Sequence, residues 1–567
     1  MDSTTELDHA WWKESVFYQI YPRSFNDSDG DGIGDLPGIT ERVAYLDDLG
    51  VDAVWLSPVY DSPQRDNGYD IRDYRAIDDD YGDMADWERL RSSLHDHDIR
   101  LVMDLVVNHT SEEHEWFQRS RRREGKYEDY YIWRAGDPDE PPNNWESIFG
   151  GPAWSYDDVR GEWYLHLFAE NQPDLNWRNP DVRESILDVA RWWLERGVDG
   201  FRMDAITYLS KRAGLPDGDP EKPLVGSEHY AHGPRIEEYV ALLCDVCEAY
   251  DAVTIAEMGH TSIEQAAAYT DADGPGIDLS FQFDHVHPGY DPANVFDPEL
   301  PTEWELTAFK RIVAEQQRTI PWNTLFFGNH DLPRAVSRIG DERYRRESAT
   351  LLATCLLTMR GTPFVYQGEE LGMSNADFGS LAEVDDPMVV GQIEAMVEDG
   401  TLAEPADGMD IVNAWSRDHS RTPMQWSGEA QAGFTDGEPW LTVTDDYREI
   451  NVAADRADER SVWHYYRRLI ERRHEEDVLV YGEFDLLLPE DEQLFVYLRT
   501  LGSDRILVAL NFSSETIERS LPDSAGFDPE SASLLECNYG ETEDENDRGA
   551  SGTGLALRPW EARVYQL

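Results

Sequence analysis

Three acidic residues follow short apolar segments that are typical of buried strands: Asp204 in GFRMDAI, Glu257 after VTIA, and Asp331 at the end of GNHD. Arg202 lies two positions before Asp204, so on a strand both side chains point to the same side. A neighbouring guanidinium lowers the pKa of a carboxyl, which predicts an ionised Asp204. Glu257 follows an apolar segment, where partial burial raises a carboxyl pKa and suits a general acid. One ionised carboxylate opposite one protonated carboxyl is the machinery of retaining glycoside hydrolysis.

A single acid after a strand is more often a helix cap or a surface charge. Here the acids are accompanied by Arg202, His330 and His109, which also lie at or near predicted strand ends. The combination of acids, imidazoles and a guanidinium at equivalent positions favours one shared site.

Eight short β-branched or aromatic segments alternate with helical patterns and must position these residues. Apolar strands separated by helices indicate a parallel sheet covered on both faces. Eight such units predict a closed (β/α)8 TIM barrel with its site at the carboxyl ends of the strands. The segments are 16–21, 52–58, 99–109, 200–206, 252–258, 279–283, 324–331 and 364–370.

Two long stretches interrupt the alternation, and the pattern changes near the C-terminus. The stretch after the third strand is too long for a βα loop and predicts an excursion domain at 110–175. A second insert, about 371–455, follows the eighth strand. The segments VYGEFDLLL, LFVYLRT, RILVALNF and ARVYQL alternate as antiparallel strands do and predict a C-terminal β-sandwich. The predicted division is barrel 1–109 and 176–479, excursion domain 110–175, and C-terminal domain 480–567.

The chain is strongly acidic, with 115 Asp and Glu against 49 Lys and Arg, a net charge of −66 and only five lysines. Such a surface repels itself, and salt screens that repulsion. Because the acids are scattered over the whole chain, we interpret the charge as adaptation to the cytoplasm of an extreme halophile; an ordinary acidic protein is the alternative. The charge also argues against a nucleic-acid partner.

The N-terminal segment has neither the basic nor the apolar region of a secretory leader, and no apolar run reaches the length of a membrane span. We therefore expect a cytoplasmic protein with no membrane partner, present as a monomer or small homo-oligomer.

Several ordered motifs carry a family resemblance. DLVVNH (104–109), GFRMDAI (200–206), AEM (256–258) and GNHD (328–331) resemble the four signature regions of the α-amylase family, glycoside hydrolase family 13, and QPDLNW (172–177) resembles its fifth region. The N-terminal FYQIYPRSFNDSDGDGIGDLPGI, with NGYDIRDY (67–74) and SRTPMQW (420–426), is similar to the oligo-1,6-glucosidase and α-glucosidase branch. The resemblance covers nearly the whole chain.

The resemblance implies roles for the site residues. Asp204 would be the nucleophile, Glu257 the general acid and base, and Asp331 the stabiliser of the oxocarbenium-like state. The implied sugar-binding residues are His109, Arg202 and His330, Tyr69 as a stacking ring, and Asp70 with Arg421 at the non-reducing end. Phe149, Phe168 and Gln172 are expected as pocket walls, with core packing as the alternative for the two phenylalanines.

The resemblance also implies an exo-acting α-glucosidase. In this branch a Val after the nucleophile accompanies α-1,6 cleavage and a smaller residue accompanies α-1,4 cleavage. Ala205 therefore favours maltose and short α-1,4-linked oligosaccharides, with transglucosylation and with activity at high salt. The alternatives are an oligo-1,6-glucosidase, a glucosyl hydrolase of the sucrose or isomaltulose type, or an inactive transporter-associated homologue, which would have lost the catalytic acids.

The stretch NDSDGDGIGD offers oxygen ligands at the spacing of an EF-hand loop, and Gly32 permits the sharp turn. The twelfth position is Gly38 instead of a bidentate Glu, and a strand precedes the loop instead of a helix. The resemblance implies one structural Ca²⁺, with Mg²⁺ possible in its place; an acid-rich loop without metal is the alternative. The candidate ligands are Asp27, Asp29, Asp31, Asp35 and the carbonyl of Ile33.

Overall fold

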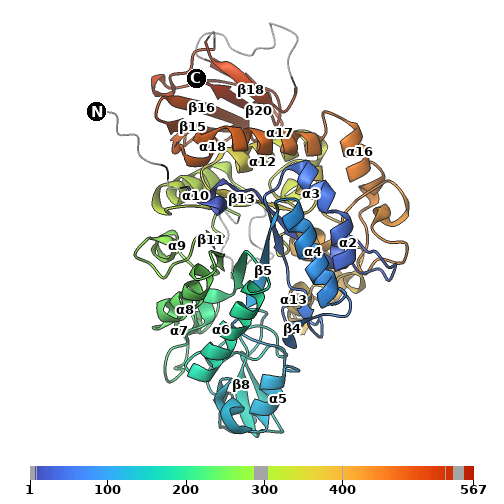
Figure 1. Cartoon of the computed structure of the whole chain (residues 1–567), viewed down its shortest axis with the longest axis vertical. Helices are drawn as coiled ribbons and strands as arrows, with labels where there is room; N and C mark the ends of the chain where they lie inside the picture. Colours follow the sequence, from blue (N-terminus) through green and yellow to red (C-terminus); the bar gives the residue numbers. More distant parts are fainter. Residues whose placement is uncertain (1–6, 8, 287–303, 399, 530, 541–553) are drawn as a thin grey trace.

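The computed structural model describes residues 7, 9–286, 304–398, 400–529, 531–540 and 554–567. The first six residues, which contribute to the expectation of no secretory leader, lie outside this range. The barrel occupies the middle of the molecule, the C-terminal sheet lies at one end, and the excursion strands lie at the other (Figure 1). No helix in the described part is both long enough and apolar enough to cross a membrane.

The central sheet has eight parallel strands in the order β11-β10-β9-β5-β2-β1-β13-β12. The hydroxyl of Thr324 in β12 donates to the carbonyl of Ser280 in β11 at 2.7 Å, which joins the two outer strands. The predicted TIM barrel is confirmed. Its strands are β1 (Phe17–Ile20), β2 (Ala53–Leu56), β5 (Arg100–Val106), β9 (Gly200–Asp204), β10 (Val253–Glu257), β11 (Leu279–Phe281), β12 (Thr324–Leu325) and β13 (Thr362–Tyr366).

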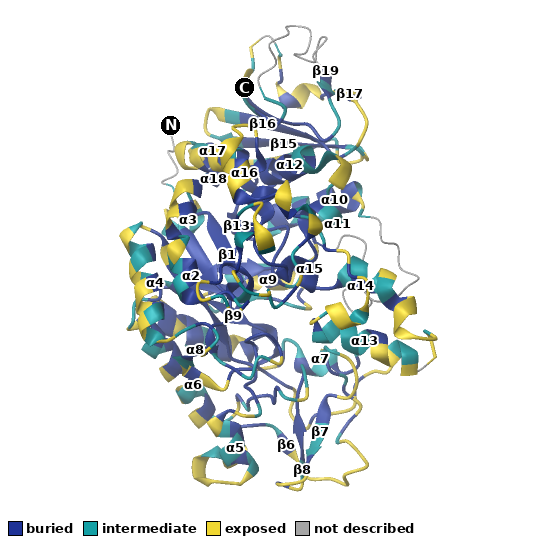
Figure 2. Ribbon diagram, turned by 90° about the vertical axis from the view of Figure 1, so that its right-hand side faces the viewer, coloured by how far each residue is buried: buried dark blue, intermediate teal, exposed yellow. Residues whose placement is uncertain are grey.

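Every residue of these strands is buried except Arg100 at the start of β5 and Glu257 at the end of β10, as a sheet covered on both faces requires (Figure 2). The barrel interior is largely aromatic: Phe17 stacks on Phe364 with ring centroids 4.6 Å apart, and Trp55 packs against Phe281. The helices between and after the strands include α2 (Leu36–Glu41), α3 (Val43–Leu49), α4 (Met84–Asp96), α6 (Pro180–Leu194), α8 (Ile236–Glu248), α9 (Ile263–Thr270), α10 (Leu306–Thr319), α12 (Arg345–Thr358) and α17 (Val462–Glu475).

Local signals explain where these elements begin and end. The side chain of Asn179 accepts from the amide of Asp181 at 2.9 Å and caps α6, as predicted. The predicted seventh strand was too long: β12 ends at Leu325. Further along, Asn329 accepts from the amide of Asp331 at 2.8 Å, so an Asx turn replaces the extended backbone.

The long interruptions carry their own structure. After β2 comes an antiparallel hairpin of β3 (Tyr60–Asp61) and β4 (Asp73–Ile77). The stretch after β5 contains α5 (Glu115–Arg121) and an antiparallel sheet in the order β6-β8-β7, whose strands are β6 (Trp133–Arg134), β7 (Trp154–Asp157) and β8 (Glu162–Leu165). The insert after β13 contains α13 (Pro387–Glu398), α14 (Met409–Trp415), α15 (Asp418–Arg421) and α16 (Val452–Ala457).

The C-terminal strands form a five-stranded antiparallel sheet with a separate two-stranded pair beside it. The predicted strand beginning at Val480 was wrong at its start, because Val480 lies within helix α18 (Asp477–Tyr481) and β14 begins at Glu483. The strands are β14 (Glu483–Leu487), β15 (Leu494–Leu501), β16 (Asp504–Asn511), β18 (Ser533–Cys537) and β20 (Ala562–Gln566), with β17 (Ile517–Ser520) and β19 (Gly554–Leu557) as the pair.

Candidate active site

A cavity of about 170 Å³ opens at the carboxyl ends of the barrel strands. Asp204 and Glu257 are the last residues of β9 and β10, His109 follows β5, and Asp331 follows β12. The barrel thus brings together residues that are far apart in the sequence. The lining residues are Asp66, Tyr69, His109, Phe149, Phe168, Asp204, Glu257, His330, Asp331, Met388 and Arg417.

Arg202 lies beneath the cavity and joins its acids. Its Nη1 is 2.5 Å from Asp204 Oδ1 and 2.8 Å from Asp104 Oδ1, and its Nη2 is 2.8 Å from Glu257 Oε1. Asp104, on β5, is fully buried and also accepts from the indole of Trp55 at 2.8 Å. One guanidinium therefore faces three carboxyl groups, so its single positive charge cannot balance all three if each is ionised.

Burial raises the pKa of Asp204 to about 6 and that of Glu257 to about 7, against the opposing charge of Arg202. The expectation that Arg202 would hold the pKa of Asp204 low was wrong, because loss of hydration outweighs the single guanidinium. The charges of Asp204 and Asp331 raise the pKa of Glu257 further. Glu257 is consequently the group that keeps its proton to higher pH, as a general acid requires.

The backbone after Asp204 fixes the second carboxyl oxygen of Glu257. Ala205 has φ 49°, in the left-handed region that non-glycine residues rarely adopt. In this conformation its amide donates to Glu257 Oε2 at 2.9 Å. The strained backbone of Ala205, directly after β9, therefore helps to hold the carboxyl of Glu257 at the end of β10.

Asp331 is surrounded by cationic and imidazole groups. Its carboxylate lies 3.1 Å from His330 Nε2, 3.1 Å from Arg421 Nη2 and 3.3 Å from Arg417 Nη1. Burial would raise the pKa of Asp331, but these neighbours outweigh it and hold the pKa well below its usual range. Burial lowers the pKa of His330 to about 3, so the fixed positive charges near neutral pH are the two guanidiniums. Asp331 is therefore ionised throughout the neutral range.

Aromatic rings complete the walls of the cavity. Tyr69 stacks on His330 with centroids 5.3 Å apart, and Phe149 meets Phe168 edge-on at 5.7 Å. Gln172 does not line the cavity; its amide donates to Asp66 at 2.9 Å from behind the wall. Of the predicted sugar-binding residues, Tyr69, His109, Phe149, Phe168 and His330 line the cavity, whereas Arg202 and Gln172 support it.

The predicted pairing of Asp70 with Arg421 is not what the structure shows. Asp70 is fully buried, and its carboxylate accepts from the hydroxyl of Ser62 at 2.9 Å and the amide of Asp66 at 3.1 Å, which closes the turn between β3 and β4. Arg421 instead donates to the carbonyl of His330 at 2.9 Å.

The acid–guanidinium pair that lines the cavity in place of the expected pair consists of Asp66 and Arg417. Asp66 Oδ1 lies 3.8 Å from Arg417 Nη2. Each lies four positions before the residue expected, in the same loop motif. Arg417 also lies over the ring of Phe149, 5.5 Å from its centroid. Met388, near the start of α13, also lines the cavity, and no sequence motif pointed to it. Asp104 belongs to the motif DLVVNH but was not assigned a role from the sequence.

The aspartate loop gathers three carboxylates: oxygens of Asp27, Asp29 and Asp35 lie within 4.8 Å of one another. Burial raises the pKa of Asp35, and the neighbouring charge of Asp27 raises it further. Hard oxygen donors placed this close fit a Ca²⁺ ion, which would relieve their repulsion. Asp31 is not in this group; its carboxylate accepts from the amide of Ile33 at 2.8 Å.

A parallel barrel with adjacent carboxyls at the ends of its strands fits a TIM-barrel glycosidase. Residues 19–482 match the family described as alpha amylase, catalytic domain. The chain therefore belongs to the α-amylase family, glycoside hydrolase family 13, and is a hydrolase of the oligo-1,6-glucosidase and α-glucosidase type.

Relatives with a named activity match the chain over nearly its full length. It is 46% identical to an oligo-1,6-glucosidase of Parageobacillus thermoglucosidasius, over 99% of this chain and 100% of the relative. It is 44% identical to an α-glucosidase of Pediococcus pentosaceus, over 98% and 99% of the two chains. The crystal structure of an isomaltulose synthase from Klebsiella sp. LX3 is similar with a TM-score of 0.92 at 41% identity, over 99% of this chain and 100% of that chain.

Proposed function

We propose that this enzyme is a retaining, exo-acting α-glucosidase that releases glucose from the non-reducing end of maltose and short α-1,4-linked oligosaccharides. The observation that carries the proposal is the binding of Asp204 and Glu257 to the two terminal nitrogens of one guanidinium, that of Arg202. This arrangement keeps the carboxyls adjacent, and retaining enzymes place them only about 5–5.5 Å apart.

In this mechanism ionised Asp204 attacks the anomeric carbon while Glu257 gives its proton to the leaving oxygen. The glycosidic C–O bond breaks and a covalent β-glucosyl-enzyme forms. Glu257, now a carboxylate, takes a proton from water, and the water oxygen replaces Asp204 at the anomeric carbon. Ionised Asp331 stabilises the positive charge that develops in both steps. A sugar hydroxyl in place of water gives transglucosylation.

The small volume of the cavity supports removal of one terminal sugar. Its volume of about 170 Å³ is below the roughly 300–1,000 Å³ typical of pockets for larger ligands. Asp66 and Arg417 supply a hydrogen-bond acceptor and a donor that suit sugar hydroxyls. We assign them, in place of Asp70 and Arg421, to the recognition of the non-reducing end.

The linkage preference depends on Ala205, whose small side chain beside Asp204 favours α-1,4 over α-1,6 glucosides. A difference of this size contributes only about 1–3 kcal/mol to discrimination. The second candidate is an oligo-1,6-glucosidase or a sucrose-type glucosyl hydrolase, favoured by the names of relatives such as the one that is 46% identical.

We further propose one structural Ca²⁺ held by Asp27, Asp29 and Asp35, and a working environment of high salt. The carboxylate cluster supports the first, and the net charge of −66 supports the second. The four cysteines are all free and buried, which is consistent with a reducing cytoplasm.

One assay series tests the function. Purified enzyme at about 2–4 M KCl, where charge is screened within a few ångströms, is given maltose, isomaltose, sucrose and trehalose separately, and the anomer of released glucose is followed by NMR. The proposal expects fastest hydrolysis of maltose and initial release of α-glucose. Faster hydrolysis of isomaltose would overturn the linkage assignment, and initial β-glucose would overturn the mechanism. The variant Asp204→Asn should be inactive on all four sugars.

A further inference from the structure

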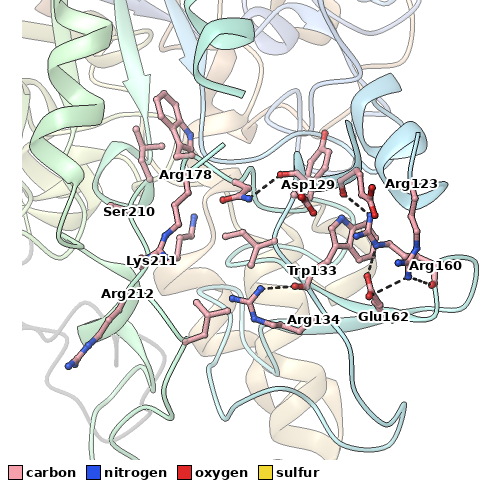
Figure 3. A pocket seen from close by; sticks show the side chains of 17 residues that line it. Arg123, Asp129, Trp133, Arg134, Arg160, Glu162, Arg178, Ser210, Lys211 and Arg212 are labelled. Carbon is pink, nitrogen blue, oxygen red and sulfur yellow. Dashed lines mark hydrogen bonds and ion pairs between the residues drawn. The ribbon is translucent and has the colours of Figure 1, made fainter. Parts of the chain in front are cut away.

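A second cavity, of about 450 Å³, lies between the excursion sheet and the segment that follows β9 (Figure 3). Trp133 and Arg134 come from β6, Arg178 from the turn before α6, and Lys211 from the loop after β9. None of its lining residues lines the candidate active site. It is therefore a separate concavity with its own chemistry.

Its charge is opposite to that of the chain as a whole. The lining contains six cationic and three acidic side chains, whereas the chain has 49 Lys and Arg against 115 Asp and Glu. Cations are thus concentrated here in a protein that has few of them. They are Arg123, Arg134, Arg160, Arg178, Lys211 and Arg212.

Some of these cations already have acidic partners. Lys211 is buried, forms an ion pair with Asp174 and donates to Asn108 at 2.8 Å. Arg160 lies 2.6 Å from Glu162, and Arg123 lies 3.3 Å from the same carboxylate. The charges of these three cations are therefore largely balanced within the protein.

Arg134 and Arg178 differ. In the described part of the chain each makes its hydrogen bond to a backbone carbonyl: Arg134 Nη1 to Trp133 at 2.7 Å, and Arg178 Nη2 to Lys211 at 2.8 Å. Neither forms an ion pair with a described acid. Both side chains belong to exposed residues, so solutes can reach them. Both arginines line the same cavity, and in agreement with that placement partial burial and the charge of Arg178 lower the pKa of Arg134.

We propose that this cavity binds an oxyanion of the phosphate class, free or as the phosphate group of a small metabolite, through Arg134 and Arg178. A guanidinium presents paired N–H donors that match two oxygens of a phosphate at once. A doubly charged oxyanion relieves the repulsion between the two arginines more than a singly charged chloride does, and its separate oxygens match the paired N–H donors. The cavity is also large enough to hold more of a phosphorylated molecule than its phosphate group.

Isothermal titration calorimetry on the full-length protein tests the site, at constant ionic strength in about 2 M KCl to screen the acidic surface. The probes are inorganic phosphate and glycerol 3-phosphate, and added KCl is the control. Saturable binding of phosphate is expected. The double variant Arg134→Gln/Arg178→Gln should bind at least about tenfold more weakly, since it loses its charge-assisted hydrogen bonds. Tighter binding of glycerol 3-phosphate identifies the phosphate of a metabolite as the ligand, and equal binding identifies free phosphate.

The matched control is Arg318→Gln, which removes the same charge from an exposed position on α10. It should bind phosphate as the unmodified protein does, and the melting temperatures of all variants report whether they are folded. The proposal is overturned if phosphate gives no more heat than KCl, or if the folded double variant binds phosphate with unchanged affinity.

Discussion

Replacing Asp104 with Asn removes one negative charge from beneath the active site without altering a residue that lines the cavity. Asp104 and Asp204 both accept from Nη1 of Arg202, at 2.8 and 2.5 Å. The charge of Asp104 is one of the causes that raise the pKa of Asp204 to about 6, after burial. Without it, the ionised form of Asp204 is more stable and its pKa falls.

The size of the shift follows from the geometry. The two carboxylate oxygens share one nitrogen, so they lie roughly 5 Å apart, where two charges interact by about 3 kcal/mol at an effective dielectric constant near 20. That energy corresponds to about two pKa units. Because burial also raises the pKa of Asp104 itself to about 6, its carboxylate is only partly ionised where Asp204 titrates. A shift of about one unit is expected, from about 6 to about 5.

The assay is the pH dependence of kcat/KM for maltose at constant high salt. Activity should fall on the acid side as Asp204 gains a proton, and on the alkaline side as Glu257, with a pKa raised by burial to about 7, loses one. Asp104→Asn should move the acid limb down by about one pH unit, and the alkaline limb should move in the same direction, because the charges of Asp104 and Glu257 also interact. Asp157→Asn, another buried acid paired with an arginine, is the control and should move neither limb. An acid limb that stays fixed or rises in a folded Asp104→Asn enzyme would refute the electrostatic reasoning.

Three further outcomes are expected. Glu257→Gln should lower kcat/KM for maltose by about 10²–10⁴-fold and less for a p-nitrophenyl glucoside, whose leaving group needs little protonation; equal losses would contradict the general-acid role. Ala205→Val should move the ratio of isomaltose to maltose hydrolysis by about 10–200-fold toward isomaltose, and an unchanged ratio would rule out this residue as the determinant. EDTA should lower the melting temperature of the enzyme but not the kcat of the folded enzyme. The Asp27→Asn variant should melt at the temperature of the EDTA-treated enzyme, whether or not EDTA is present. An unmodified enzyme whose melting temperature is unchanged by EDTA would argue against the metal.

The strand-borne part of the site was predictable because a strand has a fixed period. Arg202 and Asp204 point to one side of β9, and the barrel then places Glu257 beside them. The loop-borne part was not predictable in the same way. Asp66 and Asp70 are the same residue type in one turn, and Arg417 and Arg421 flank and end the one-turn helix α15, so no long period decides which member faces the cavity.

The pKa of Asp204 was mispredicted for a related reason. The sequence shows the neighbouring guanidinium, but not the depth of burial or the third carboxyl, that of Asp104, which shares Arg202. The domain boundaries, the bound Ca²⁺ and the halophilic origin stay predictions.

The aspartate loop does more than gather carboxylates, because it is fastened to the insert that follows the last barrel strand. The Asp27 carboxylate accepts from the hydroxyl of Thr435, its amide donates to the carbonyl of Phe434 at 3.0 Å, and the amide of Trp440 donates to Gly32 at 3.0 Å. A protease cut in the exposed segment 403–407 would leave these contacts intact. The two fragments would then migrate together in a native gel and separate only in denaturant.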